Sequence, residues 1–345
     1  MRSESDRAAR TAGVSKLMRA LQHPQVRPVI YQALLATGVG LAAWYFTSNA
    51  AENLWQRRIA SGFGFLAHEA GFEVGESAFL SYDSTDTYLR AIAVGFFNTF
   101  RVSVLAILFS TVLGGFIGLT RLSPNWLLAK LAAAYIEVIR NIPLVVQLFF
   151  WYAVITESLP APADALSPAP GIFLSNRGFA FPIIVTGAPL ALEYPVLSGF
   201  GFSGGGLLSP EFAALLLGLS LYTAAFTAEI VRAGIVAVER GQYEVAYSLG
   251  LNHRQVMRYI VLPQALRVIV PPVTSQYLNC TKNSSLAVAI GYPDLVSIAN
   301  TTINQTGQAI EGIAIIMIVY LTISLAIAGF MNWYNRRFAL RGSQR

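Results

Sequence analysis

The sequence has little of what soluble enzymes rely on. Only 12% of its 345 residues are charged, about half the share in a typical soluble domain. Its single cysteine, Cys280, excludes an intrachain disulfide, and together with three histidines it forms no convincing metal-ligand cluster, so no metal site is expected. None of the three lysines follows a glycine, which excludes a G-x-x-x-x-G-K-[ST] phosphate loop. ATP hydrolysis by that route is therefore excluded, and we expect no enzyme activity from this chain.

Apolar sequence, by contrast, is abundant: 54% of the residues are hydrophobic, and the mean hydropathy is +0.53. A helix needs about 20 apolar residues to cross a bilayer. Six runs reach that length, and several exceed it enough to tilt or to continue past the bilayer. The runs are 29–48, 90–120, 127–157, 209–236, 264–291 and 308–334. This pattern predicts an all-α integral membrane protein, a polytopic helical bundle.

The basic residues predict an orientation, because cytoplasmic loops carry most of the Lys and Arg of a membrane protein. With six spans, the basic regions all fall on one side, and these regions are 1–28, 121–130, 237–263 and 338–345. Both termini are therefore predicted to be cytoplasmic, in a multi-pass protein of a bacterial inner membrane. We interpret the net charge of +6 as a topology signal, and we expect membrane lipid but no nucleic acid as a partner.

Two long segments, 49–89 and 158–208, are predicted to lie outside. The first is expected to form a partly ordered hairpin or a surface helix. The second is rich in Pro and Gly, and its apolar piece 179–192 is too short and too broken by proline to span a bilayer. A buried or interfacial lid and a tolerated surface insertion both remain open for it.

The segment 244–263, EVAYSLGLNHRQVMRYIVLP, is polar and lies between two long apolar runs. Gly250 is expected to end one short helix in a left-handed cap, and Asn252 to cap a second helix. The second helix has an apolar face made by Val256, Ile260 and Leu262. Such a segment fits a groove on a partner, or it lies on the membrane surface as an amphipathic helix.

Charged side chains inside spans are costly, so they usually face a cavity or a partner. Glu137 and Arg140 are three residues apart and are expected to pair on one helix face. Pro143 lacks a backbone donor and therefore frees the carbonyl of Ile139 one turn earlier. Lining of a translocation path and plain structural pairing remain equally open for this pair.

Glu229 and Arg232 repeat the same spacing on a span rich in small residues. Small residues let helices approach closely in lipid. For this second pair, the alternatives are lining of a path and packing at a subunit interface.

The string NCTKNSSLA, residues 279–287, places a polar run inside an apolar span. Asn and Ser side chains compete for the backbone and weaken a helix, and non-helical backbone at membrane depth is tolerated against a cavity. The amides and the ammonium of Lys282 are expected to hold a carboxylate there, as broken helices do in transporters. A polar contact between helices is the alternative. Pro271 and Pro272 are expected to kink the same span.

The segment 244–263 also resembles a family signature. Importer permeases of ABC transporters carry E-A-A, three residues, G, nine residues, I, one residue and L-P in a cytoplasmic loop, and this chain departs only at Val245. The resemblance implies that the loop docks into a separate ATPase subunit. The residues that the resemblance assigns to this coupling are Glu244, Ala246, Gly250, Leu251, Ile260, Leu262 and Pro263.

Three further strings resemble segments of polar amino acid permeases. EVIRNIPLVVQ resembles E-x-x-R-G-T-P-L-x-x-Q with Asn141 and Ile142 as departures, AAFTAEIVRAGI resembles A-Y-x-x-E-x-x-R-G-G, and TKNSSL resembles K-D-T-S-L with Asn283 replacing the acid. GYPDLVSIANTTINQTGQA and the insertion 158–208 are most similar to the general L-amino acid branch. The residues expected to line a substrate path are Arg140, Asn141, Gln147, Glu229, Arg232, Gln276, Asn279, Lys282, Asn283, Ser284 and Ser285.

The resemblance implies a type I ABC importer permease with a core at 90–337 and an extra helix at 29–48. It also implies a homologous permease as a heterodimer partner, two ATPase subunits that carry ATP and Mg, and a periplasmic amino-acid-binding protein that delivers an L-amino acid. No cofactor is expected on this chain. An ATP-independent transporter or channel, a scaffold without a path, and a permease for another small polar solute remain alternatives.

Overall fold

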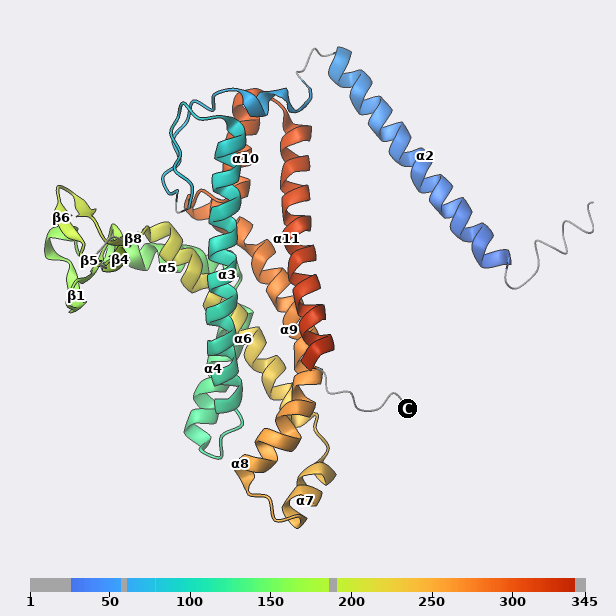
Figure 1. Ribbon diagram of the computed structural model, residues 1–345, viewed down its shortest axis with the longest axis vertical. Coiled ribbons are helices and arrows are strands. Elements are labelled where there is room, and N and C mark those ends of the chain that lie inside the picture. The colour runs from blue at the N-terminus through green and yellow to red at the C-terminus, as the bar shows by residue number, and fades with distance from the viewer. Residues whose placement is uncertain (1–25, 57–60, 78, 186–190, 339–345) are drawn as a thin grey trace, which may run out of the picture. The chain divides into compact units, whose positions relative to one another are not determined.

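The computed structural model describes residues 26–56, 61–77, 79–185 and 191–338, and it divides the chain into two units, 1–61 and 62–345 (Figure 1). In the first unit the described part is one helix, α2 (Val26–Gln56), which contains the predicted span 29–48 and continues beyond it. Its side chains are largely exposed, as an apolar helix without a neighbour in its own unit must be. Most of the predicted basic arm and the tail 339–345 lie outside the described residues.

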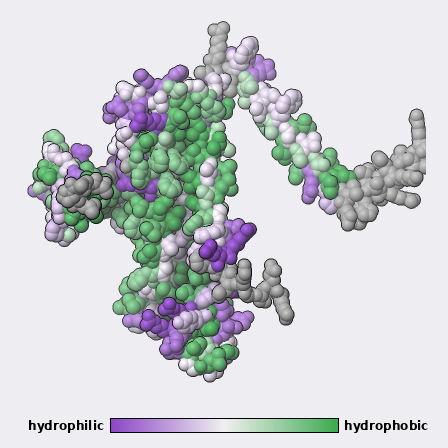
Figure 2. All heavy atoms as spheres, in the orientation of Figure 1, coloured by the Kyte–Doolittle hydropathy of each residue, from purple (hydrophilic) through white to green (hydrophobic). Residues whose placement is uncertain are grey.

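The second unit contains the remaining long helices. They are α3 (Tyr88–Thr120), α4 (Trp126–Asn141), α5 (Leu144–Ala153), α6 (Pro210–Val236), α9 (Leu262–Asn283), α10 (Leu295–Thr306) and α11 (Ala309–Phe338). In the described part of the chain, five helices are long and apolar enough to cross a membrane, or six if one bent pair counts as a span. Figure 2 shows hydrophilic residues gathered at the two ends of this unit and hydrophobic residues along the helices between them. The predicted helical membrane bundle is thus confirmed.

Polar side chains mark where the spans begin. The Thr87 hydroxyl accepts from the backbone N–H of Arg90 at the start of α3. Ser209 accepts from the N–H of Phe212 at the start of α6, where Pro210 occupies the first helical position. These caps satisfy backbone donors that a helix start leaves free.

The expected single span 127–157 is wrong in one respect, because α4 and α5 meet at an angle of 104°. The bend lies at Ile142, whose backbone is extended with φ −96° and ψ 127°. Pro143 causes it, since a proline disfavours the helical conformation for the residue before it and cannot donate to the preceding turn. After α5 the chain continues into a π-helical turn, η2 (Val154–Ser158).

The polar run 279–287 does not unwind the span, contrary to expectation. Helix α9 continues to Asn283 and tightens into a 3-10 helix, η5 (Ser284–Ile290), which ends at Gly291 with φ +79°. The hydroxyls bond to carbonyls of their own helix: Ser284 Oγ donates to Thr281 O at 2.7 Å, and Ser285 Oγ donates to Lys282 O at 2.7 Å. Because the hydroxyls are satisfied locally, they do not pull the backbone out of the helix.

The paired prolines, at which a kink is predicted, do not interrupt the helical assignment of α9. Pro271 and Pro272 both lie inside the continuous helix. The apolar segment extends further than the predicted 264–291, since helical turns run without a long break from His253 to Ile290. Two short pieces precede α9: α8 (His253–Gln255) and the π-helical η4 (Val256–Val261).

The insertion 158–208 forms strands rather than a span, as its proline content predicts. A four-stranded antiparallel sheet has the order β1-β2-β3-β8, with β1 (Leu166–Ala169), β2 (Ile172–Ser175), β3 (Gly178–Phe181) and β8 (Gly206–Leu208). Two separate hairpins pair β4 (Ile183–Val185) with β5 (Ala191–Glu193), and β6 (Val196–Ser198) with β7 (Gly201–Ser203). A short 3-10 turn, η3 (Pro162–Asp164), precedes them. Phe179 and Leu208 pack against the main core and so fix the four-stranded sheet to the helices.

The other segment predicted to lie outside, 49–89, was expected to form a partly ordered hairpin or a surface helix; its residues 49–56 belong to α2, and the described residues of 61–87 form a loop that we call the strap. The strap contains one short 3-10 turn, η1 (Phe63–Ala67), and an antiparallel bridge between Glu69 and Thr87, and its described residues include no surface helix. Aromatic contacts hold the strap to α3, since the rings of Phe65 and Tyr88 lie 5.9 Å apart edge to face. The strap thereby covers the first turns of α3 and α10.

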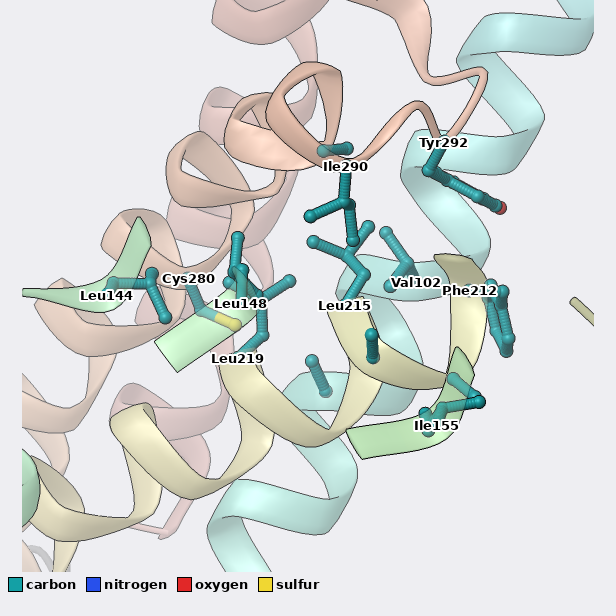
Figure 3. Packing of buried hydrophobic residues seen from close by; sticks show 14 residues of the cluster. Val102, Leu144, Leu148, Ile155, Phe212, Leu215, Leu219, Cys280, Ile290 and Tyr292 are labelled. Carbon is teal, nitrogen blue, oxygen red and sulfur yellow. The ribbon is translucent and has the colours of Figure 1, made fainter. Parts of the chain in front are cut away.

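The main core lies where α3, α5, α6 and α9 meet (Figure 3). Figure 3 shows Leu215 of α6 between Val102 of α3 and Leu148 of α5, with Leu219 of α6 and Cys280 of α9 beside Leu148. Buried side chains in protein interiors are close-packed, so these helices have fixed positions relative to one another.

Two glycines let α3 and α6 approach to backbone contact. A Cβ at Gly114 would lie 2.7 Å from the Cβ of Thr227, and one at Gly118 would lie 2.6 Å from the carbonyl oxygen of Ala228. The adjacent Gly115 faces open space, with nothing within 4 Å of a Cβ there. Small residues at such sites are the usual means of close helix packing in membranes.

We therefore expect Gly114→Ala to destabilise the protein, by about 1–3 kcal/mol, because the new methyl group overfills the contact between α3 and α6. Gly115→Ala is the matched control and should have little effect, since its methyl group meets no atom. The measurement is the thermal unfolding midpoint of each purified variant in detergent. Equal midpoints for the two variants would show that the close approach contributes nothing.

Candidate functional site

The segment 240–261 at one end of the second unit folds as two helical pieces joined by a turn (Figure 1). Helix α7 (Arg240–Ser248) ends before Gly250, whose φ of +78° is left-handed, as predicted. Asn252 caps α8 in a capping box with Gln255, with bonds of 3.0 and 2.9 Å between their side chains and backbones. Both helix ends are therefore fixed by local chemistry.

A buried face joins this segment to the ends of α6 and α9. Ala246, Val256 and Val261 are almost fully buried in one apolar cluster with Ile235 and Ala265. The π-helical turn η4 places Val256 and Val261, five residues apart, on the same side. The predicted apolar face is consequently wrong at one position.

The misplaced position is Leu262, which is 42% exposed, while Val261 takes the buried place. Ile260 is half-buried, so it belongs to the face only in part. Pro263 lies in the first turn of α9, where a proline is tolerated. Leu251 is half-buried beside the same cluster.

The outer face of the segment is apolar and exposed. Leu249 is 75% exposed, Val245 is 62% exposed and Tyr259 is 63% exposed, and Glu244 is also exposed beside them. Val245, the residue that departs from the signature, lies on this exposed face, whereas its neighbour Ala246 lies on the buried face. Leu249 was not among the predicted site residues, although a leucine directly before a helix-ending glycine in a polar segment is a usable signal. We call the segment 240–261 the knob, and its exposed apolar side chains make this face a candidate docking surface.

A polar pocket of about 410 Å³ lies between the ends of α3, α4 and α6, and it brings two of the predicted pairs together. Its lining consists of Arg121, Ile136, Glu137, Arg140, Asn141, Phe226 and Glu229. The two strings that resemble permease segments therefore meet in space, although about 90 residues of sequence separate them.

Glu229 is held between two arginines. Arg232 Nη2 donates to Glu229 Oε1 at 2.6 Å, which confirms the predicted pair. Arg121 Nη1 contacts the other carboxylate oxygen of Glu229. All three side chains are about one quarter to one third exposed. Arg121 was missed as a site residue because it had been assigned only to a basic loop.

The predicted ion pair between Glu137 and Arg140 does not form: the ion pairs in the described part of the chain include neither residue. The guanidinium carbon of Arg140 lies 4.8 Å from the ring centre of Phe226 instead. Stacking of this kind is favourable for an arginine. Asn141 Nδ2 donates to the carbonyl of Glu137 at 2.8 Å. Glu137 and Arg140 are both exposed to the pocket, so their charges face its interior.

Gln147 has a structural position at the bend. Its Nε2 donates to the carbonyl of Ile139 at 2.9 Å and to that of Ile142 at 3.0 Å. The carbonyl of Ile139 is the one that Pro143 was predicted to free, so the side-chain amide replaces the missing backbone donor. Gln147 is only 4% exposed, and we assign it to the bend rather than to the path.

The path residues predicted from the polar run 279–287, together with Gln276, lie on α9 and η5. They do not line the polar pocket. Lys282 and Asn279 are exposed, while Gln276, Asn283 and Ser285 are half-buried. Ser284 is fully buried and its hydroxyl is bonded within its own helix. Within the described residues, the structure therefore separates the α9 set from the pocket set.

A buried polar clamp at the opposite end of the second unit was not predicted. Glu76 of the strap pairs with Arg101 of α3 at 2.6 Å, and its other oxygen accepts from Ser209 Oγ at 2.5 Å. Asn98 Nδ2 donates to the carbonyls of Glu76 and Pro293, at 2.8 and 2.9 Å. One carboxylate thus joins the strap to α3 and to the first turn of α6.

Asp294 completes the polar contacts at this end. It caps α10, and its Oδ1 accepts from the N–H of Ser297 at 2.8 Å. Burial raises the pKa of Asp294 to about 7, against the lowering effect of the backbone N–H groups and of Tyr320. No group of three or more His, Cys, Asp or Glu side chains among the described residues could hold a metal ion.

Comparison with known proteins agrees with this geometry. A family model described as "Binding-protein-dependent transport system inner membrane component" matches residues 110–340. The chain is 46% identical over 377 residues to the putative amino-acid ABC transporter permease protein YhdX of Escherichia coli, covering 92% of this chain and 95% of the relative. It is 41% identical over 378 residues to the general L-amino acid transport system permease protein AapQ of Rhizobium johnstonii, covering 93% and 94%.

Solved structures give the same fold. The crystal structure of an amino acid ABC transporter with histidines matches with a TM-score of 0.54 and 28% identity, covering 72% of this chain and 95% of that chain. An inward-facing MetNI methionine ABC transporter matches with a TM-score of 0.50 at 15% identity, and this likeness shows the fold alone. It covers 72% of this chain and 97% of that chain.

The triad of Glu229 and two arginines generates one prediction. Glu229→Gln should lower the thermal unfolding midpoint, because it leaves two arginine charges unpaired near the end of a span, where such charges are costly. Glu137→Gln is the matched control in the same pocket, and it removes no ion pair. If both variants unfold at the same temperature as the unmodified protein, the triad has no stabilising role.

Asp294 generates a prediction about pH. Because its folded pKa lies above the ordinary value of 3.8, its neutral form favours the folded state, and stability is lost as pH rises from about 4 to about 7. Asp294→Asn keeps a helix-capping side chain but cannot titrate. The unfolding midpoint of the unmodified protein, relative to that of the variant, should therefore fall between pH 4 and 7 and level off above. A constant difference over this range would contradict the prediction.

Proposed function

The chain belongs to the family of binding-protein-dependent transport system inner membrane components, and from this premise we propose that it forms one half of the path through an ATP-driven importer of L-amino acids. It is a multi-pass membrane permease subunit of the ABC transporter class. We further propose that ATP and Mg bind on a separate ATPase subunit. The sequence has no G-x-x-x-x-G-K-[ST] phosphate loop, which supports ATP binding on a different subunit.

The observation that carries the proposal is the knob formed by 240–261. Its outer face exposes Val245 and Leu249, while its inner face buries Ala246 and Val256 against the ends of α6 and α9. A partner that moves the outer face therefore moves those helices as well, because the buried contacts do not allow the knob to slide. This is the arrangement that coupling to an ATPase requires. Glu244, exposed beside Val245, is proposed to contact the ATPase.

The proposed mechanism is alternating access. ATP binding draws two ATPase subunits together, and the knob passes this closure to the permease as a rigid-body motion. The polar pocket is proposed to line the path. Glu137 and Arg140 both face it, so a zwitterionic amino acid can present its ammonium to one and its carboxylate to the other. Lys282 and Asn279 are proposed to act from α9 as further contacts.

The proposed assembly contains a second, related permease, two ATPase subunits and a soluble amino-acid-binding protein. Both termini and the knob are proposed to be cytoplasmic, because the basic residues gather at that side. The binding protein is proposed to dock at the opposite end, on 292–307 and on the four-stranded sheet of the insertion. The names of two relatives support amino acids as the substrate class. One is a general L-amino acid transport system permease, and the other is a permease of a glutamate/glutamine/aspartate/asparagine transport system.

The proposal predicts that Gly250→Val abolishes coupling. Valine is strained at φ +78°, at a cost of about 1–2 kcal/mol or more, so the turn that presents the knob changes shape. The measurement is ATPase activity of the purified complex in lipid, with and without amino-acid-loaded binding protein. We expect stimulation by the loaded binding protein to fall about tenfold or more, while the variant still inserts into membranes.

Gly241→Val is the matched control, since Gly241 lies in the same segment with open space around it and no left-handed backbone. It should retain stimulation. Full stimulation in the Gly250 variant would contradict the coupling role. No ATPase recovered with the unmodified chain would favour an ATP-independent transporter or channel, and stimulation by other polar solutes alone would exclude amino acids as the cargo.

A further inference from the structure

The two hairpins of the insertion, β4–β5 and β6–β7, expose an apolar surface that has no partner in the described part of the chain. Phe200 at the tip of β6–β7 is 91% exposed, which is unusual for so large an apolar side chain. The other large apolar side chains exposed on the strands of the two hairpins are Ile184, Val185, Leu192, Val196 and Leu197.

The β6–β7 hairpin is held at its base. The rings of Phe173 in β2 and Phe202 in β7 stack with 4.9 Å between their centres. Gly205 has a left-handed φ of +62°, and a Cβ there would lie 2.7 Å from the carbonyl of Phe181. A surface that is fixed in this way binds a partner without a large ordering cost.

Neither water nor lipid is a favourable environment for this exposed apolar surface. An isolated two-stranded hairpin is marginal in water, and the free edges of such strands cannot enter the hydrocarbon of a bilayer. A lipid headgroup surface attracts Lys and Arg, yet residues 178–208 contain neither, and Glu193 is their one charged residue. A protein surface is therefore the favoured occupant.

The lack of charge also indicates what kind of protein contact this is. Permanent interfaces are more apolar than transient ones, and charged residues are depleted at their centres. A soluble binding protein docks and leaves in every cycle, whereas the two permease subunits of an importer stay together. We infer that β4–β5 and β6–β7 pack against the second permease subunit, an inference that rests on the proposed function.

The position of the hairpins fits a contact at the outer end of the path. In Figure 1 the strands lie to one side of the helices, next to α5. The insertion returns to the bundle at Ser209, which caps α6 and bonds to Glu76 at 2.5 Å. Contact with the second subunit would therefore be transmitted to the first turn of α6, the helix whose other half carries Glu229.

The test is site-specific photocrosslinking in the complete transporter in membranes. A benzophenone-bearing amino acid replaces Phe200 in one preparation and Leu166 in a control preparation; Leu166 is 52% exposed on β1, in the same insertion but outside the hairpins. We expect the Phe200 position to capture the second permease subunit and the Leu166 position not to. Capture of the binding protein or of lipid alone, no capture, or equal capture from Leu166 would each overturn the inference.

A second measurement uses the double variant Leu197→Asp, Phe200→Asp against Leu166→Asp. The amount of second permease recovered with the tagged chain in mild detergent should fall about tenfold for the double variant and remain unchanged for the control, as loss of central apolar anchors predicts. Unchanged recovery for the double variant would overturn the inference alone. If the unmodified chain recovers no second permease at all, the proposed pairing of subunits fails instead, so the two failures are distinguishable.

Discussion

The backbone contact between α3 and α6 at Gly114 and Gly118 is the constraint on which the rest of the second unit depends. With no side chain between them, the two helices run in direct contact. This contact makes two polar connections between them possible: Glu76 of the strap bonds both to Arg101 of α3 and to Ser209, the cap of α6, and Arg121 at the end of α3 contacts Glu229 of α6. A wider spacing would leave these charges unpaired inside a membrane, where that is costly.

The bend at Pro143 makes the polar pocket possible. A straight span over 127–157 would carry its polar residues along one helix, whereas the 104° turn leaves Glu137 and Arg140 at the end of α4, facing α6. The bend leaves the carbonyls of Ile139 and Ile142 without backbone donors, and the side-chain amide of Gln147 donates to both of them. The fold therefore combines a rigid helix pair with one broken helix that lines a cavity, and irregular backbone at membrane depth is tolerated in such a place.

The sequence predicts those features that are local. Gly250 and Asn252 act within a few residues, so their caps follow from residue type, and the apolar runs follow from length alone. The errors have physical causes. The π-helical turn shifts the buried face from Leu262 to Val261, and the hydroxyls of α9 bond within their helix rather than unwinding it. Contacts such as Glu76 with Arg101 and Arg121 with Glu229 join distant segments, and no local pattern encodes them.

Cys280, the one thiol of the chain, is only 1% exposed within the main core. Thiol-specific reagents therefore have no accessible target on the unmodified protein. Reporter groups can be attached to cysteines placed at chosen surface positions, for example at Gly241 on the knob, without first replacing the native residue. The buried thiol thus makes the chain suited to distance measurements by spectroscopy, in which the travel of the knob during a transport cycle can be followed directly in the otherwise native protein.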